Sequence, residues 1–168
     1  DTSNLDTISE TTGIPPALLD NTTPENTKVL VKNFEGGGSQ TSYFDTNSNL
    51  LGTSDTWTDA ETNATSTNFM DAEGNWLGVR SSDPLNGFFN SSFSTTQYAS
   101  DNVTITGYIE QGTDKQVDPA TNETIFERSF NYVFNAGREL LSGTETENGI
   151  QITYGANWEV TGRKVNVF

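Results

Sequence analysis

A short segment recurs along this chain and constrains its fold more than any other feature. The sequence FDTNSNLLG at residues 44–52 returns as FMDAEGNWLG at residues 69–78, and more faintly as FNAGRELLSG at residues 134–143. Each copy has an apolar strand end, a tight loop of Asp, Asn and Gly, and a return strand that begins with large apolar residues. A five-residue loop that closes a β-hairpin explains this pattern. The sequence therefore predicts a fold built from antiparallel hairpins.

The first two loops also place side-chain oxygens at alternate positions, which is the arrangement found in the first half of known calcium loops. Plain turn chemistry is the alternative, because Asp and Asn favour loops without any metal. Two such loops in an acidic chain favour calcium, and two further acids, Asp55 and Asp59, follow the first loop. The candidate metal ligands are Asp45, Asn47, Asn49, Asp55, Asp59, Asp71, Glu73 and Asn75.

The composition limits the partners of this chain. Its 23 acidic and 8 basic residues give a formal charge of −15, and the acids are scattered along the sequence. Nucleic acid is a poor partner for such a chain, because there is no basic patch to neutralise phosphates. An anionic membrane surface is disfavoured for the same reason. No apolar run in the sequence is long enough to span a membrane, so membrane insertion is not expected. Bound calcium or a salty environment would each account for the excess acid.

The chain contains neither Cys nor His. Zinc, copper, haem and iron–sulfur sites lose their usual ligands, so oxygen-ligated calcium or magnesium are the metals that remain. A chain without disulfides is more typical of a bacterial extracellular module than of a secreted eukaryotic domain. Because the sequence starts at Asp1 without Met or a signal peptide, we expect a monomeric module from a larger secreted or cell-surface protein.

Short β-rich segments with turns between them predict an all-β fold, an antiparallel β-sandwich or flattened barrel that is stabilised by calcium. Strands are expected at 28–34, 41–44, 50–58, 66–70, 76–82, 103–109, 124–134, 140–147, 150–154 and 158–167. Residues 83–101 and 112–122 are expected to be long loops. Residues 1–26 form a lead-in segment or linker in this prediction, with one short helical turn as an option, and residues 27–168 form a single ligand-binding domain.

Several large side chains are candidates for ligand contact. Trp57, Trp76, Trp158 and Tyr98 are able to form a stacking or apolar wall, although core packing is the commoner role of Trp. Arg80 precedes Ser82 and Asp83, and its guanidinium group would pair either with a ligand carboxylate or with a nearby Asp. The candidate ligand-binding residues are Trp57, Trp76, Arg80, Ser82, Asp83 and Tyr98.

The repeated FDxxxNLLG unit and the ending YGANWEVTGRKVNV at residues 154–167 resemble segments of giant bacterial repeats-in-toxin (RTX) adhesins. The resemblance covers roughly residues 30–168, and the glycine-rich nonapeptide repeats of those proteins are missing from it. It implies a small β-rich domain that binds a peptide or a sugar on a host or algal cell surface, with calcium at or near the site.

Binding is expected, and catalysis is not. Nucleophilic triads usually need a His base, and the chain has none. A glycosidase needs two facing carboxylates, and no acidic pair here has a recognisable context. We therefore expect a calcium-dependent adhesin module that recognises a short extracellular peptide. A carbohydrate-binding module and a calcium-rigidified spacer remain the alternatives.

Overall fold

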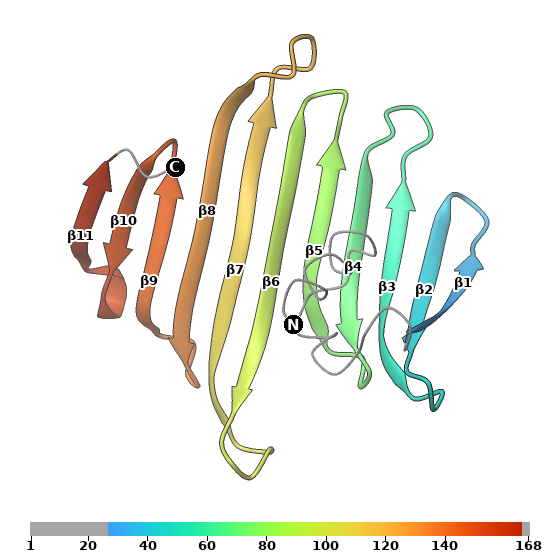
Figure 1. Ribbon diagram of the computed structural model, residues 1–168, viewed down its shortest axis with the longest axis horizontal. Coiled ribbons are helices and arrows are strands. Elements are labelled where there is room, and N and C mark those ends of the chain that lie inside the picture. The colour runs from blue at the N-terminus through green and yellow to red at the C-terminus, as the bar shows by residue number, and fades with distance from the viewer. Residues whose placement is uncertain (1–26, 166–168) are drawn as a thin grey trace. The chain divides into compact units, whose positions relative to one another are not determined.

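The computed structural model describes residues 27–165, and these fall into two compact units, one ending at Asp83 and the other beginning at Pro84. Each unit is an antiparallel meander in which consecutive strands are neighbours (Figure 1). The predicted lead-in segment, residues 1–26, lies outside the described residues. The prediction of one domain over residues 27–168 stays a prediction.

Unit 1 has five strands joined by short turns. They are β1 (Lys28–Asn33), β2 (Gly38–Phe44), β3 (Leu50–Thr58), β4 (Thr65–Asp71) and β5 (Trp76–Asp83). Because the strands alternate in direction, the β2–β3 and β4–β5 turns lie at one end of the unit. The β1–β2 and β3–β4 turns lie at the other end.

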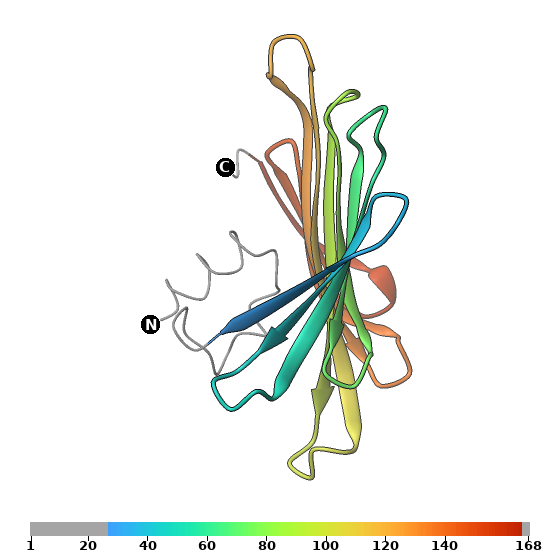
Figure 2. The same cartoon turned by 90° about the vertical axis from the view of Figure 1, so that its right-hand side faces the viewer.

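Unit 2 has six strands and one short 3₁₀ turn. The strands are β6 (Phe88–Tyr98), β7 (Ile105–Val117), β8 (Thr124–Asn135), β9 (Leu140–Glu147), β10 (Ile150–Tyr154) and β11 (Val160–Val165), and η3 (Ala156–Trp158) precedes β11. Figure 2 shows β6, β7 and β8 nearly edge-on, as a thin twisted layer.

One irregularity recurs along both units. In six hairpins of the described chain, the return strand carries an extra residue directly after its first paired position. In the first of them Phe44 pairs with Leu50 and Tyr43 pairs with Gly52, so Leu51 is the extra residue. Such β-bulges increase the local twist and fix the register of a hairpin. The repeated sequence is therefore a repeated hairpin with its own bulge.

Glycines and aromatic rings pair across neighbouring strands and supply much of the packing. Tyr43 lies opposite Gly52, Phe69 opposite Gly78, and Tyr132 opposite Gly143. These three aromatic residues are among the most buried described residues, with exposed fractions of 4%, 1% and 9%. A ring that lies over a strand glycine covers backbone that would otherwise face water.

The predicted all-β, antiparallel fold without long helices is confirmed. In the described part of the chain no helix has the length and hydrophobicity to cross a membrane.

The two predicted long loops are wrong. Residues 88–98 form β6, and residues 112–117 continue β7. The polar side chains of this pair bond across the strands, as Ser91 Oγ and Thr113 Oγ1 do at 2.9 Å. Hydroxyl pairs of this kind stabilise a strand pair that has little hydrophobic signal.

Candidate functional site

The first Asp loop is closed by its own carboxylate. Asp45 Oδ1 accepts hydrogen bonds from the backbone N–H groups of Asn47 at 2.9 Å and Asn49 at 2.8 Å. Asp45 Oδ2 accepts a third from Asn49 Nδ2 at 3.1 Å. The bond from the Asn49 backbone N–H is the largest cause that lowers the pKa of Asp45. The carboxylate thus closes the loop through its own hydrogen bonds, without a bound ion.

The second Asp loop repeats this geometry. Asp71 Oδ1 accepts from the backbone N–H groups of Glu73 and Asn75 at 3.0 and 2.8 Å, and Asp71 Oδ2 accepts from Asn75 Nδ2 at 3.0 Å. The third copy uses a neutral residue in the same place. Asn135 Oδ1 accepts from the backbone N–H of Glu139 at 2.9 Å. Loop closure therefore needs an acceptor at this position and does not need a charge.

A second kind of loop escaped the sequence analysis. Residues 59–64 (DAETNA) and 118–123 (DPATNE) share the pattern Asp-x-x-Thr-Asn-x. In both, the Asp carboxylate accepts hydrogen bonds from the backbone N–H groups two and three residues later. In both, the Asn takes a positive φ, 57° at Asn63 and 62° at Asn122. The repeat was visible in the sequence as a DxxTN motif.

The candidate metal ligands do not gather at one point. The loops of Asp45 and Asp71 lie at one end of unit 1, and Asp59 lies in the β3–β4 turn at the other end. Asp55 lies within β3 and accepts a hydrogen bond from Gln40 Nε2 at 3.0 Å. Within residues 27–165 no group of three or more acidic side chains is placed to hold a metal ion. Calcium coordination by these loops stays a prediction.

Two of the predicted ligand residues do share one face of unit 1. The register of β3, β4 and β5 and the alternation of side chains place Trp57 and Trp76 on the face that also carries Asn68. Trp76 Nε1 donates to Asn68 Oδ1 at 3.1 Å. Trp57 stacks on Phe34 with a centroid distance of 6.2 Å and lies against Gly38. Both indoles remain half exposed, at 52% and 51%.

A row of polar side chains crosses the strands between these indoles. Gln40, Asp55 and Asn68 occupy directly paired positions on β2, β3 and β4. We call this set, Trp57, Trp76, Gln40, Asp55 and Asn68, the aromatic platform. From strand spacing and rise, the Cα atoms of its two tryptophans lie about 16 Å apart. The platform therefore presents two apolar ring surfaces with amide and carboxylate groups between them.

Two of the other predicted ligand residues, Arg80 and Ser82, do not share the face of the platform. Arg80 and Ser82 alternate with Ser81 along β5 and lie on the opposite face of unit 1, where Arg80 pairs with Thr67 and Ser82 with Thr65. Asp83 ends β5. Tyr98 belongs to unit 2, where it ends β6 opposite Ile105.

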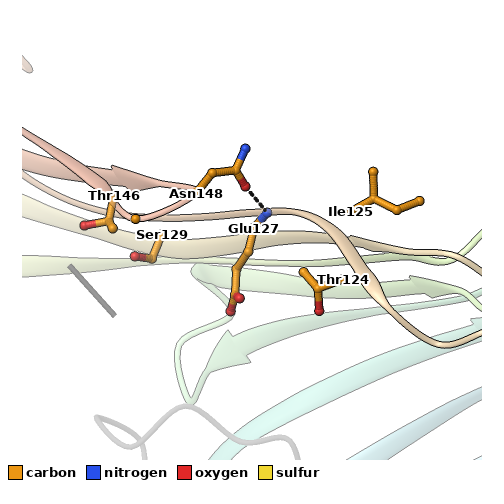
Figure 3. Close-up of a pocket in the computed structure, with 7 residues that line it drawn as sticks. Thr124, Ile125, Glu127, Ser129, Thr146 and Asn148 are labelled. Atoms are coloured by element: carbon orange, nitrogen blue, oxygen red, sulfur yellow. Dashed lines mark hydrogen bonds between the residues drawn. The ribbon is translucent and has the colours of Figure 1, made fainter. Parts of the chain in front are cut away.

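Unit 2 carries a shallow hollow beside the β9–β10 turn, with a volume of about 520 Å³ (Figure 3). Thr124, Ile125, Glu127, Ser129, Thr146, Asn148 and Gly149 line it. Asn148 closes its rim, because Asn148 Oδ1 accepts from the Glu127 backbone N–H at 3.1 Å and the Asn148 N–H donates to the Glu127 carbonyl at 3.0 Å. A second polar hollow shares Ser129 and Thr146 with it and extends across β6 to β10.

The opposite face of unit 2 is built from aromatic rings and ion pairs. Tyr132 lies between Phe130 and Trp158, with centroid distances of 5.0 Å to each. Its hydroxyl donates to Glu145 Oε2 at 2.7 Å. Burial is the main cause that raises the pKa of Tyr132, and this hydrogen bond raises it further. Arg128 Nε bonds Asp114 Oδ2 at 3.1 Å. The polar groups on this face form hydrogen bonds and ion pairs with one another. We therefore assign this face a stabilising role in the unit.

Comparison of the chain with protein-family models, with curated proteins and with solved structures finds no match. The likeness to RTX adhesin domains therefore rests on the quoted segments alone.

Proposed function

We propose that this chain is a binding module that recognises a neutral glycan on its aromatic platform, within a secreted or cell-surface adhesive protein. The observation that carries the proposal is the pair of half-exposed indoles, Trp57 and Trp76, on one face with hydrogen-bonding groups between them. Binding sites for small ligands combine apolar walls with a few polar groups that fix orientation.

The chemistry of the platform suits a sugar better than a peptide. The C–H faces of a pyranose ring stack on an indole, and its hydroxyls pair with amide and carboxylate oxygens. Asn68 and Gln40 each supply donors and acceptors, and Asp55 supplies acceptors. With a formal charge of −15, the chain repels anionic ligands at low ionic strength, which favours a neutral glycan. The peptide expected from the sequence rested on the resemblance to RTX adhesins and on Arg80, and Arg80 lies on the other face.

A structural spacer is the second candidate. The recurrence of one bulged hairpin along both units favours it, since repeated units of this kind are typical of extended scaffolds. Long loops on a rigid sheet would favour a ligand-binding role over a spacer, but most of the residues predicted as such loops belong to β6 and β7.

A glycan array of neutral and acidic oligosaccharides, probed with the full chain, separates the two candidates. The proposal predicts neutral glycan hits that Trp76→Ala weakens by about 5- to 30-fold, the cost of losing one central contact of 1–2 kcal/mol. Ile125→Ala, an exposed apolar change in unit 2, is the matched control and should leave binding unchanged. An array without hits would support the spacer. Hits that survive Trp57→Ala and Trp76→Ala together would contradict binding on the aromatic platform.

A further inference from the structure

The last strand of unit 2 has the properties of a docking edge. β11 pairs with β10 on one side and is the terminal strand of its sheet among the described residues. A terminal strand presents alternate N–H and C=O groups that lack a strand partner. β11 contains no proline, so none of these donors is removed.

The charge of this strand is opposite to that of the chain. Arg163 and Lys164 are consecutive in β11, which contains no acid, although acids outnumber bases by 23 to 8 overall. Both side chains are exposed, and neither makes an ion pair or a hydrogen bond with another described residue. The strand therefore offers two available cations on an otherwise acidic molecule.

The other terminal strand differs in this respect. β1 also carries two lysines, but Lys28 Nζ donates to the Thr46 carbonyl at 3.4 Å. Lys32 Nζ lies 5.5 Å from the centre of the Phe34 ring. These lysines already have partners, so β1 serves as an internal comparison for β11.

We propose that the outer edge of β11 binds an acidic, extended polypeptide segment as an additional strand. The main-chain groups of the edge supply hydrogen bonds, and side-chain pairs supply the selectivity. Because successive side chains point to opposite faces, Arg163 and Lys164 require two consecutive acids in the partner. Exposed Val165, 59% accessible, favours an apolar residue next to them. The recognised pattern is an apolar residue followed by two acids.

Lysine and arginine on an edge strand also discourage pairing between identical molecules. That effect agrees with the proposal, since a second basic edge is repelled and an acidic strand is attracted. The proposal needs neither calcium nor the aromatic platform, so it stands or falls separately from glycan binding.

The test uses the isotope-labelled full chain and the capped peptide Thr-Val-Glu-Asp-Thr-Thr-Val, followed by amide NMR and hydrogen exchange. We expect shifts and slower exchange at β11 amides, with little change at β1. Replacing Glu-Asp by Gln-Asn in the peptide should weaken binding roughly 2- to 30-fold, the sum expected for two exposed ion pairs.

The double variant R163E/K164E should lose the acidic peptide and gain its Lys-Arg counterpart, whereas K28E/K32E should bind like the unmodified chain. The charge reversal changes only exposed side chains, and an unchanged far-UV spectrum confirms that each variant folds. The proposal is overturned if β11 amides do not respond at millimolar peptide, if the response lies at β1, or if charge reversal leaves the affinity unchanged.

Discussion

Gly143 of β9 lies directly beneath the ring of Tyr132 of β8, so close that a Cβ atom added to the glycine would sit 2.7 Å from Tyr132 Cδ1. The same ring donates its hydroxyl proton to Glu145, two residues along β9. One aromatic side chain thus covers a glycine and fixes a carboxylate on the neighbouring strand. Related pairs recur as Trp57 over Gly38 and Phe130 over Gly112.

This arrangement predicts a specific cost for adding one methyl group. Gly143→Ala forces the Tyr132 ring to move and should destabilise the chain by about 1–3 kcal/mol, the usual range for overpacking. Gly162→Ala is the matched control, because its nearest neighbour would be Thr153 Cβ at 3.7 Å, an ordinary contact. Urea unfolding of both variants measures the difference, and equal stabilities would refute the packing role of Tyr132.

The loops predict that an acceptor matters more than a charge. Asn135→Ala removes the acceptor of the Glu139 N–H and should destabilise the chain by about 0.5–1.5 kcal/mol. Asn135→Asp keeps the acceptor and should retain most of the stability. The reciprocal change Asp45→Asn should likewise be milder than Asp45→Ala. If Asp45→Asn and Asp45→Ala lower the melting temperature equally, the carboxylate does more than close the turn.

Calcium at the Asp45 and Asp71 loops has a direct test. Extracellular sites with dissociation constants of roughly 0.1–1 mM would each add about 1.4–2.7 kcal/mol at about 10 mM calcium. The calcium prediction is a higher melting temperature in calcium than in chelator, and Asp45→Asn should reduce that increase without opening the turn. Identical melting curves in both solutions would contradict calcium binding by the folded chain.

Asp101 predicts a local response to acid. Its carboxylate accepts from the Thr104 hydroxyl and from the backbone N–H groups of Val103 and Thr104, which lowers its pKa to about 2. A carboxyl with a lower pKa in the folded state stabilises the fold above its unfolded value, and this contribution is lost as the pH falls from 3.8 towards 2. NMR titration should show this low pKa, and Thr104→Val should raise it. A titration at the ordinary value would contradict the turn geometry.

The sequence predicted most strands well because turn residues punctuate it. The segments around Asn148–Gly149 and the two Asp loops carry strong local signals, and β3, β9 and β10 begin and end where expected. β6 and the second half of β7 were missed because Ser, Thr and Gln give them little hydrophobic alternation. Their stability comes from cross-strand partners such as Ser91 and Thr113, which only the register brings together.

The candidate site was predicted less well than the fold. Trp57 and Trp76 lie 19 positions apart in the sequence, and their common face depends on a bulge at Leu77 that shifts the β4–β5 register. Arg80 was a candidate because its guanidinium group suits a ligand carboxylate, yet alternation along β5 turns it to the other face. Asp55 was considered as a metal ligand, and its partner is the Gln40 amide.

The three indole N–H signals of the folded chain test the central claim most directly. They report Trp57 and Trp76 on the aromatic platform and Trp158, which packs against Tyr132 and Tyr154 in unit 2. When a neutral oligosaccharide from the array is titrated into the labelled chain, we predict saturable shifts at Trp57 and Trp76 and a constant Trp158 signal. Constant Trp57 and Trp76 signals at saturating oligosaccharide, or a shift confined to Trp158, would contradict glycan binding on this platform.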